Sequence, residues 1–543
     1  MVQRGGLACV GLLLLAVAFF PSSYGSSSPG LRFAEVSRVR VEGRAPQRIA
    51  PSSGWARRAA AAARPEVDFN CDGRQDFLTS SHLADLPNSL GELVPNAGAA
   101  YVAYGKPNGA LANGQRLTIV DASLEPHRDD QFGRSITVGH IDLDGCTDVV
   151  VGMDGFDAQF GSIATAGAVV LYRGSRGGLE FSRLIEHSKA GEAFGHAVSL
   201  ANLDGEEGDE LIVSAIGARV RKKASAGKLL VFSASYLRGD SDEPPQTVTR
   251  ASLGFKPRAN DFWGTSLFAG DFNHDLNVDI GVGAEFANDG AGIFNVVYGP
   301  GLSEGQEVSL PNGRPGQRFG HAGVSLRLND DDFPDPLVTV PGFDDNTGAA
   351  FGLLSSEDGL TGQALLLDNP ESARGDFDWW DVDHIGGPGH NTLASGAPGT
   401  DLVLDGDLLA EGGGVNLIGV RYLKGPDAYA LSWDKVEIGR HAGPTRPQET
   451  TWNQTTHSGW AIGLRSIRAP KLWELAYGEP GLTCDLEDHS GAIAFTRLKF
   501  DPDRNKKAKV LRRGAGGSCY APPLFPAGQP WQGDEFGQNL LGF

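Results

Sequence analysis

The chain has 543 residues, of which 40% are apolar and 21% charged, and its formal net charge is −20. This apolar content suffices for a packed core, so wholesale disorder is excluded, and the acidic balance argues against a nucleic-acid partner, which needs a basic surface. Glycine is abundant, at 75 residues, but lacks the period of collagen. It indicates many tight turns between short strands.

Residues 1–25 are typical of a secretory signal peptide. Arg4 precedes an apolar run at 7–20, and Ser23 and Gly25 supply small residues for a cleavage site. The alternative is an N-terminal anchor helix, but the run is short for crossing a membrane. No later stretch is long and apolar enough to span one, so we expect a secreted protein without a membrane span.

Residues 26–65 differ in composition from the rest. They are rich in Arg, Ser, Pro and Ala, so the acidic excess lies in 66–543. We expect a basic, flexible N-terminal arm here, with a docked strand at 32–41 as the alternative. The folded body is then 66–543.

The body contains internal repeats, which decide the fold. One signature is an apolar strand that opens with glycine, and its copies occupy 98–105, 167–174, 227–232, 292–299, 348–351, 414–417 and 491–495. These are seven copies of one unit, the last three weaker than the others.

A second signature is an aromatic residue followed by glycine, and its copies are Phe132-Gly133, Phe194-Gly195, Trp263-Gly264, Phe319-Gly320 and Phe536-Gly537. A degraded copy lies at 458–460, and 375–380 stands where another is due. An acidic loop begins seven residues after the glycine and leads into an apolar strand. Gly/Asp-rich turn composition alone does not explain this fixed frame.

The aromatic-glycine pair, the acidic loop and the Gly-Ala-Pro-like segment at 395–399 resemble FG-GAP repeats, which build the N-terminal β-propeller of integrin α subunits. The resemblance covers essentially all of 66–543. It implies an all-β fold, a seven-bladed β-propeller of FG-GAP repeats, here in an exported, stand-alone form.

The two ends of the body complete each other. The first acidic loop, 68–76, has no aromatic-glycine pair before it, and the last pair, Phe536-Gly537, has no loop after it. Joined head to tail they make one repeat. We therefore expect the propeller to be closed by pairing of the C-terminal strand with the N-terminal blade, which removes exposed sheet edges.

The acidic loops present the hard oxygen ligands that Ca²⁺ prefers. Side chains at loop positions 1, 3, 5 and 9, with a carbonyl at position 7, can surround one ion. The candidate ligands are Asp68, Asn70, Asp72 and Asp76 in loop 1; Asp142, Asp144 and Asp148 in loop 2; Asn202, Asp204, Glu206 and Glu210 in loop 3; and Asp271, Asn273, Asp275 and Asp279 in loop 4.

The loops are not equivalent. Loop 2 has His140, a poor calcium ligand, at position 1, and loop 5 has Arg327 there, which argues against metal unless Asp330 and Asp332 form a shifted site. We expect two to four Ca²⁺ ions with a structural role, on the face that in the family lies opposite the usual ligand surface. The alternative is Asx-turn hairpins with solvated acids.

Four cysteines remain once Cys9 is removed with the signal peptide, and an even number in an exported chain indicates two disulfides. Three connectivities are possible. Cys71–Cys146 is favoured because the two residues lie in the metal loops of adjacent units, and Cys484–Cys519 because they flank the last part of unit 7.

No motif for catalysis stands out. Ser135 and Ser266 follow the aromatic-glycine pairs with the repeat, which favours packing residues over nucleophiles. The sequence therefore predicts a calcium-stabilised, non-enzymatic recognition or adhesion module for an extracellular protein ligand. The alternatives are a carbohydrate-binding propeller, with Trp379, Trp380 and Trp460 as stacking candidates, and a polysaccharide- or phosphoester-cleaving enzyme. The ligand and the oligomeric state stay open.

Overall fold

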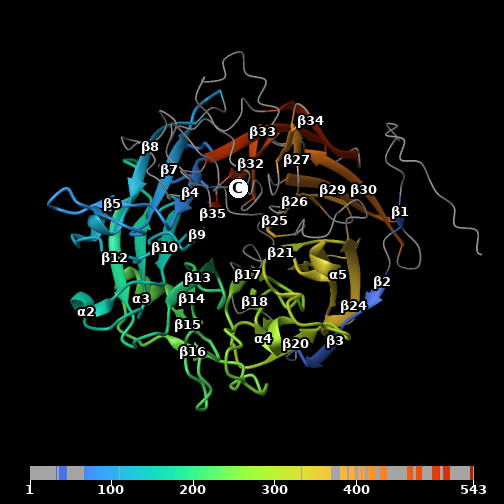
Figure 1. Ribbon diagram of the computed structural model, residues 1–543, viewed down its shortest axis with the longest axis horizontal. Helices are drawn as coiled ribbons and strands as arrows, with labels where there is room; N and C mark the ends of the chain where they lie inside the picture. The colour runs from blue at the N-terminus through green and yellow to red at the C-terminus, as the bar shows by residue number, and fades with distance from the viewer. Residues whose placement is uncertain are drawn as a thin grey trace, which may run out of the picture.

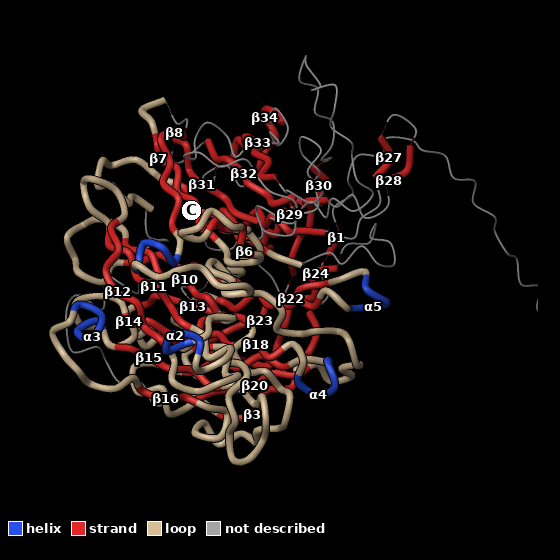
Figure 2. Tube along the Cα trace, turned by 60° about the vertical axis from the view of Figure 1, so that its left-hand side comes forward, coloured by secondary structure: helices blue, strands red, loops and turns tan. Residues whose placement is uncertain are grey.

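The computed structural model describes residues 32–33, 36–45, 67–108, 111–329, 331, 333–368, 380–387, 390–397, 402–404, 407–409, 414–423, 428–436, 462–468, 472–479, 492–501, 506–513 and 539–541. Within them, strands make up most of the regular structure (Figure 2). The helices are short: η1 (Ile119–Ala122), α2 (Ala158–Gly161), α3 (Ala234–Arg238), α4 (Ala287–Gly290) and α5 (Phe343–Asn346).

The strands form antiparallel sheets in chain order, with two small hairpins beside them. Sheet 1 contains β35 (Asn539–Leu541), β4 (Phe77–Ser81), β7 (Ala99–Gly105) and β8 (Leu111–Leu117); sheet 2 contains β9 (Ser135–Gly139), β10 (Asp148–Met153), β11 (Ala168–Arg173) and β12 (Glu180–Glu186); and sheet 3 contains β13 (Phe194–Ala201), β14 (Glu210–Ala215), β15 (Lys228–Phe232) and β16 (Gln246–Val248). Three sheets have five strands: sheet 4 contains β17 (Ser266–Gly270), β18 (Asp279–Ala284), β19 (Ile293–Val297), β20 (Gly305–Ser309) and β3 (Arg40–Gly43); sheet 5 contains β21 (Gly323–Leu326), β22 (Asp335–Val340), β23 (Ala349–Ser356), β24 (Gly359–Asp368) and β2 (Val36–Arg38); and sheet 6 contains β25 (Val382–Gly387), β26 (His390–Ala397), β29 (Gly414–Leu423), β30 (Ala428–Val436) and β1 (Arg32–Phe33). Sheet 7 contains β31 (Ile462–Arg468), β32 (Leu472–Glu479), β33 (Ala492–Asp501) and β34 (Lys506–Arg513), and the hairpins are β5 (Leu86–Pro87) with β6 (Leu93–Val94) and β27 (Leu402–Leu404) with β28 (Asp407–Leu409).

The first strands of the sheets line up around a common centre (Figure 1). From β9 each first strand contacts the first strand of the next sheet, through β13, β17, β21, β25 and β31 to β35, and β35 contacts β9 again. The other strands lie progressively further out. This is the all-β propeller that the repeats predict.

The C-terminal strand lies in the N-terminal sheet, which confirms the predicted pairing. β35 pairs antiparallel with β4, with Asn539 opposite Ser80 and Leu541 opposite Leu78. It also contacts β9 of sheet 2 and both β31 and β32 of sheet 7. One short strand therefore joins three neighbouring sheets, although the aromatic-glycine pair Phe536-Gly537 that precedes it lies outside the described residues.

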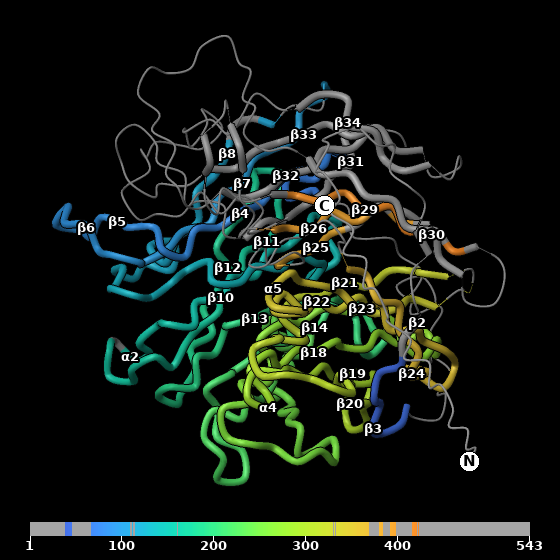
Figure 3. The backbone as a smooth tube through the Cα atoms, turned by 45° about the vertical axis from the view of Figure 1, so that its right-hand side comes forward, coloured from blue at the N-terminus to red at the C-terminus, as the bar shows by residue number. Residues whose placement is uncertain are grey.

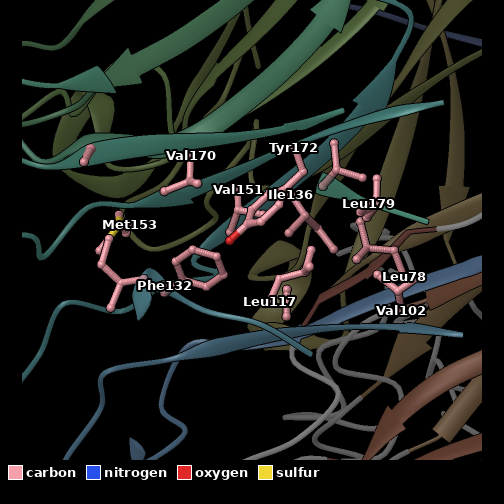
Figure 4. Close-up of a cluster of buried hydrophobic side chains, with 14 of the residues drawn as sticks. Leu78, Val102, Leu117, Phe132, Ile136, Val151, Met153, Val170, Tyr172 and Leu179 are labelled. Atoms are coloured by element: carbon pink, nitrogen blue, oxygen red, sulfur yellow. The ribbon is translucent and has the colours of Figure 1, made fainter. Parts of the chain in front are cut away.

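The second strands explain the continuous apolar runs in the sequence. β10, β14, β18 and β22 are buried along their whole length, because each sheet packs against a neighbour on both faces. The hydrophobic clusters lie between sheets. The cluster between sheets 1 and 2, for example, joins Leu78 and Val102 to Phe132, Val151 and Tyr172 (Figure 4).

The two glycine signatures are the two halves of one joint between sheets. Gly98, the first residue of a glycine-led strand, forms a parallel bridge with Phe132 of the next sheet. Its φ is +82°, and a Cβ there would lie 2.2 Å from the Phe132 carbonyl oxygen. Glycine is required because only hydrogen fits at this contact. Gly167, Gly227 and Gly292 meet Phe194, Trp263 and Phe319 in the same way.

Part of the N-terminal arm is docked on the rim, as in the docked-strand alternative rather than the flexible one. β3 pairs with β20, β2 with β24 and β1 with β30, so the arm adds an outermost strand to sheets 4, 5 and 6 (Figures 1 and 3). An outer strand offers a row of unpaired main-chain groups, and the arm satisfies them without needing a particular side-chain pattern.

Val39 fixes the arm at the crossing between sheets 4 and 5. Its backbone N–H donates to the Gly362 carbonyl at 3.0 Å, and its side chain is 8% exposed, in a cluster with residues of both sheets. We expect Val39→Asp to lower the free energy of unfolding by about 2–4 kcal/mol, since it buries an unpaired charge. Urea unfolding measures this, with Arg40→Ser, an exposed neighbour, as the control. Equal stability of the two variants would mean that the arm is not docked in solution.

Candidate functional site

The acidic loops lie at one end of the strands. Loops 2 to 5, at 140–148, 202–210, 271–279 and 327–335, join the first strand of sheets 2 to 5 to the second, and loop 1 (68–76) precedes β4. A disulfide joins Cys71 of loop 1 to Cys146 of loop 2, with the Cα atoms 4.9 Å apart, which confirms the predicted pair. Cys484 and Cys519 lie outside the described residues.

The carboxylate at loop position 9 is a buried brace. In loop 1, Asp76 accepts a hydrogen bond from the backbone N–H of Phe69 at 2.8 Å and one from that of Gly105, also at 2.8 Å. It thus joins the start of the loop to the end of the third strand, β7. Burial raises the pKa of Asp76 to about 7, and the charges of Asp68 and Asp72 act in the same direction.

The same brace recurs in the other loops, where each carboxylate accepts from the N–H of loop position 2 and from an N–H at or just beyond the end of the third strand. The acceptors are Asp148, Glu210, Asp279 and Asp335. Burial raises the pKa of Asp148 to about 6, those of Glu210 and Asp335 to about 7, and that of Asp279 well above its ordinary value. In each loop the neighbouring carboxylates add to the effect of burial.

Loops 1 and 4 have the same geometry. The carboxylate at position 1, Asp68 or Asp271, accepts from the N–H groups of positions 5 and 6 at 2.7–3.1 Å. Position 6 is left-handed in both, with φ +77° at Gly73 and +73° at Leu276, so the absence of glycine in loop 4 does not change the turn. Asn70 and Asn273 at position 3 each accept from the N–H of position 5.

Loops 2 and 3 differ at position 1. The imidazole Nδ1 of His140 lies 3.1 Å from the carbonyl oxygen of Cys146, at position 7. In loop 3, the side-chain amide of Asn202 donates to the carbonyl oxygens of Glu206 at 2.6 Å and Gly208 at 2.7 Å. In these two loops Asp144 and Asp204 accept from local N–H groups, and Asp142 lies 3.6 Å from Arg173.

The carboxylates of a loop turn to backbone N–H groups rather than toward one point. Among the described residues, one set of three His, Cys, Asp or Glu side chains has its ligand atoms within 4.8 Å of one another, and it consists of Cys71, Asp144 and Cys146. The two cysteines of this set form the disulfide and are not free to bind an ion. The residues at positions 1, 3, 5 and 9 of loops 1 and 4 would hold an ion there. Their donor sets, carboxylate and amide oxygens, fit Ca²⁺.

Loop 5 contains the brace but not the ligand set. Asp335 accepts from the N–H groups of Leu328 and Ser355, and Asp331 accepts from the N–H of Phe333 at 3.1 Å. Arg327 stands where loops 1 and 4 have an aspartate. Asp330 and Asp332, the candidates for a shifted site, lie outside the described residues.

The opposite end of the strands has polar pairs between sheets. The residue after the aromatic-glycine pair meets the residue that follows the second strand of the preceding sheet. His196 Nδ1 lies 2.7 Å from Asp154, and His321 Nδ1 lies 2.7 Å from Glu285. Nearby, Ser135 and Ser266 each donate to a glycine carbonyl of the next sheet, at 2.8 and 2.9 Å, which is a packing role.

An aromatic patch lies at this same end, over sheets 4 to 6; it is defined here as Phe262, Phe286, Arg318, His321 and Trp380. Phe286 is 42% exposed, and its ring lies 5.7 Å from that of Phe262. The Arg318 guanidinium lies over Phe286 and Trp380, 5.9 and 5.7 Å from their ring centroids. His321 lies 4.5 Å from Trp380.

Two residues of the patch have a left-handed backbone. Phe262 and Arg318, which precede the aromatic-glycine pairs, have φ of +48° and +61°. Gln131 and Ala193, which precede Phe132 and Phe194, have φ of +57° and +50°, so this left-handed residue repeats with the fold and does not single out the patch. Of this group, only Trp380 is a binding candidate by sequence. The signal available in the sequence is that Phe262 and Arg318 directly precede an aromatic-glycine pair and that His321 directly follows one.

Comparison with known proteins finds similarity to an integrin α subunit in sequence and to solved structures in fold. A segment of 181 residues, 32% of this chain, is 30% identical to integrin alpha-3 of Cricetulus griseus and covers 16% of that protein. The chain therefore matches less than a fifth of the length of this relative. No family model matches the sequence.

Two solved structures are similar over most of the chain. A protein from Lactobacillus plantarum is 8% identical, with a TM-score of 0.33, over 81% of this chain and 82% of its own. The Dos1 propeller is 11% identical, with a TM-score of 0.32, over 65% of this chain and 81% of its own. At these scores the fold rests on the strand pairings described above.

Proposed function

We propose that the chain is an exported, seven-bladed propeller of FG-GAP repeats that acts as a non-enzymatic recognition module for an extracellular protein. The closed cycle of contacts among the first strands of sheets 1 to 7 supports the blade number. The apolar segment at 7–20 supports export, and in the described part of the chain no helix is long and apolar enough to cross a membrane.

The aromatic patch is the observation that carries the proposal. Aromatic side chains and arginine are the residue types that dominate binding energy at protein interfaces. Here they stand on a rigid ring, and Arg318 is held between two rings, so little side-chain freedom is lost on binding. The patch lies at the strand ends away from the acidic loops, which leaves those loops a structural role.

Ca²⁺ is the ion that the acidic loops fit, and it would hold together loop positions that otherwise repel one another. Asp68, Asn70, Asp72 and Asp76 would hold it in loop 1, and Asp271, Asn273, Asp275 and Asp279 in loop 4. An ion that binds only the folded loops stabilises the fold by mass action.

Binding to extracellular proteins tests the proposal. The secreted chain is compared with the double variant Phe286→Ser, Arg318→Ala and with a control, Phe181→Ser, which removes a ring that is 41% exposed on β12 at the rim. We expect the wild type and the control to capture the same extracellular protein, and the double variant to bind it about 30-fold more weakly. Equal capture by all three would contradict a recognition role for the patch.

A carbohydrate ligand is the second candidate, because Trp380 gives the patch an indole ring and Arg318 and His321 lie within reach of it. A glycan array with the same three proteins distinguishes the two. Binding to a defined glycan that the double variant alone loses would replace the protein ligand by a sugar. Turnover on polysaccharide or phosphoester panels would instead establish an enzyme.

A further inference from the structure

The acidic loops fall into two chemical classes according to position 1. Loops 1 and 4 have Asp68 and Asp271, whose carboxylates only accept hydrogen bonds once ionised. The carbonyl at position 7 also only accepts. Two acceptors cannot bond to each other directly, so a cation, or a donor such as water, has to bridge these two groups.

Loop 2 joins the same two positions without an ion. The carbonyl oxygen of Cys146 only accepts, so the contact at 3.1 Å requires that His140 holds a proton on Nδ1 and donates it. His140 is itself positioned by its backbone N–H, which donates to Asp209 of loop 3 at 2.7 Å. Cys146 is positioned by the disulfide to Cys71. The position-7 oxygen that calcium would use is thus already bonded.

Loop 3 uses Asn202 in the same way. Both amide hydrogens are engaged, by Glu206 and by Gly208 at position 7, and the amide oxygen accepts from the N–H of Gly205 at 2.9 Å. The side chain is buried, with the residue 6% exposed. To present its oxygen to an ion, the amide would have to turn and give up these three hydrogen bonds.

Fixed cations also serve these two loops. The Arg238 guanidinium, on α3, donates to the carbonyl oxygens of Ile141 in loop 2 at 3.1 Å and Glu207 in loop 3 at 3.0 Å. Arg173 lies 3.6 Å from the Asp142 carboxylate. Loop 1 has a neighbouring cation as well, because Arg74 lies 2.6 Å from Asp72, so the two classes of loop differ by the group at position 1 and not by cations.

From this we infer that loops 2 and 3 are closed by the N–H groups of His140 and Asn202 in place of a cation, and that the chain binds Ca²⁺ in loops 1 and 4 alone. The inference rests on the calcium role proposed above. It narrows the expected number of bound ions, which was two to four, to two. Loops 2 and 3 then hold no ion, although the sequence predicts Ca²⁺ ligands there at Asp142, Asp144 and Asp148 and at Asn202, Asp204, Glu206 and Glu210.

Counting ions tests the inference. Native mass spectrometry of the secreted chain with added Ca²⁺ is expected to give two ions, and Asp68→Ala and Asp271→Ala are each expected to remove one. His140→Asp and Asn202→Asp each restore an oxygen ligand at position 1 and are expected to add one. His127→Asp, the same change at an exposed site outside the loops, is the control and should leave two.

The outcomes separate the two claims. No bound ion in the wild type would overturn the calcium role itself, whereas three or four ions would overturn only the present inference. A count that stays at two in His140→Asp and in Asn202→Asp would show that position 1 does not keep the ion out.

Thermal unfolding gives a second readout that does not depend on the gain of a site. His140→Gln, which keeps a donor, should keep two ions, and His140→Ala should lower the melting temperature equally in EDTA and in Ca²⁺, because the bond it removes involves no ion. A loss seen only in Ca²⁺ would contradict the inference.

Discussion

Removal of residues 534–543 is expected to abolish the cooperative unfolding transition of the whole ring. The deletion takes away β35, which pairs with β4 and contacts β9, β31 and β32. Without it the inner edge of β4 loses its partner, and apolar faces of three neighbouring sheets meet water. The loss is expected to reach about 5 kcal/mol or more, a large part of the 5–15 kcal/mol that holds a typical fold together.

Differential scanning calorimetry and gel filtration of a chain that begins at residue 26 measure this effect. A chain that lacks 26–31, which precede the first described strand, serves as the control for a short truncation at the other end. We expect the control to melt like the wild type, and the C-terminal truncation to show no sharp transition and to aggregate. An unchanged melting temperature in the truncated chain would mean that the ring does not depend on this pairing.

The closure could be predicted from the sequence because it is a matter of counting. Each repeat places the aromatic-glycine pair, the acidic loop and the apolar strand in a fixed frame, and the two ends of the chain contain complementary fragments of it. The frame also placed the acidic loops between the first two strands of their sheets, and it placed Cys71 and Cys146 on neighbouring loops.

The joint between sheets could not be predicted in the same way. Gly98 and Phe132 each belong to a repeated signature, but nothing in the frame says that the glycine of one sheet contacts the aromatic residue of the next. The docked strand at 32–41 was only the alternative prediction for the arm, for a different reason. Its three strands are held by main-chain groups, which leave no side-chain pattern, and its composition resembles that of a flexible segment.

The acidic loops show a further limit of reading a motif as a set of ligands. The pattern treats position 9 as one more oxygen donor, yet Asp76 also ties two backbone N–H groups that lie far apart in the chain. It likewise treats His140 as a missing ligand, whereas the imidazole supplies the N–H that the loop uses. Both roles depend on which carbonyl or amide lies opposite, and only the folded loop determines that.

Replacement of Asp279 by alanine is expected to lower the free energy of unfolding by about 3–5 kcal/mol, because two buried N–H groups lose their acceptor and a cavity remains. Asp279 is fully buried and accepts from Phe272 at 2.8 Å and from Gly299 at 2.9 Å. It is also the position-9 ligand of loop 4, so the variant should lose part of the rise in melting temperature that Ca²⁺ gives the wild type.

Asp335→Ala separates the two roles, because Asp335 forms the same brace in loop 5, where Arg327 replaces the aspartate at position 1. In EDTA we expect the two variants to be destabilised alike, since both lose a brace and neither loses an ion. In Ca²⁺ we expect Asp335→Ala to gain as much stability as the wild type, and Asp279→Ala to gain less. If both variants gained as much as the wild type, Asp279 would be a brace alone, and loop 4 would be stabilised as loop 5 is, without a cation.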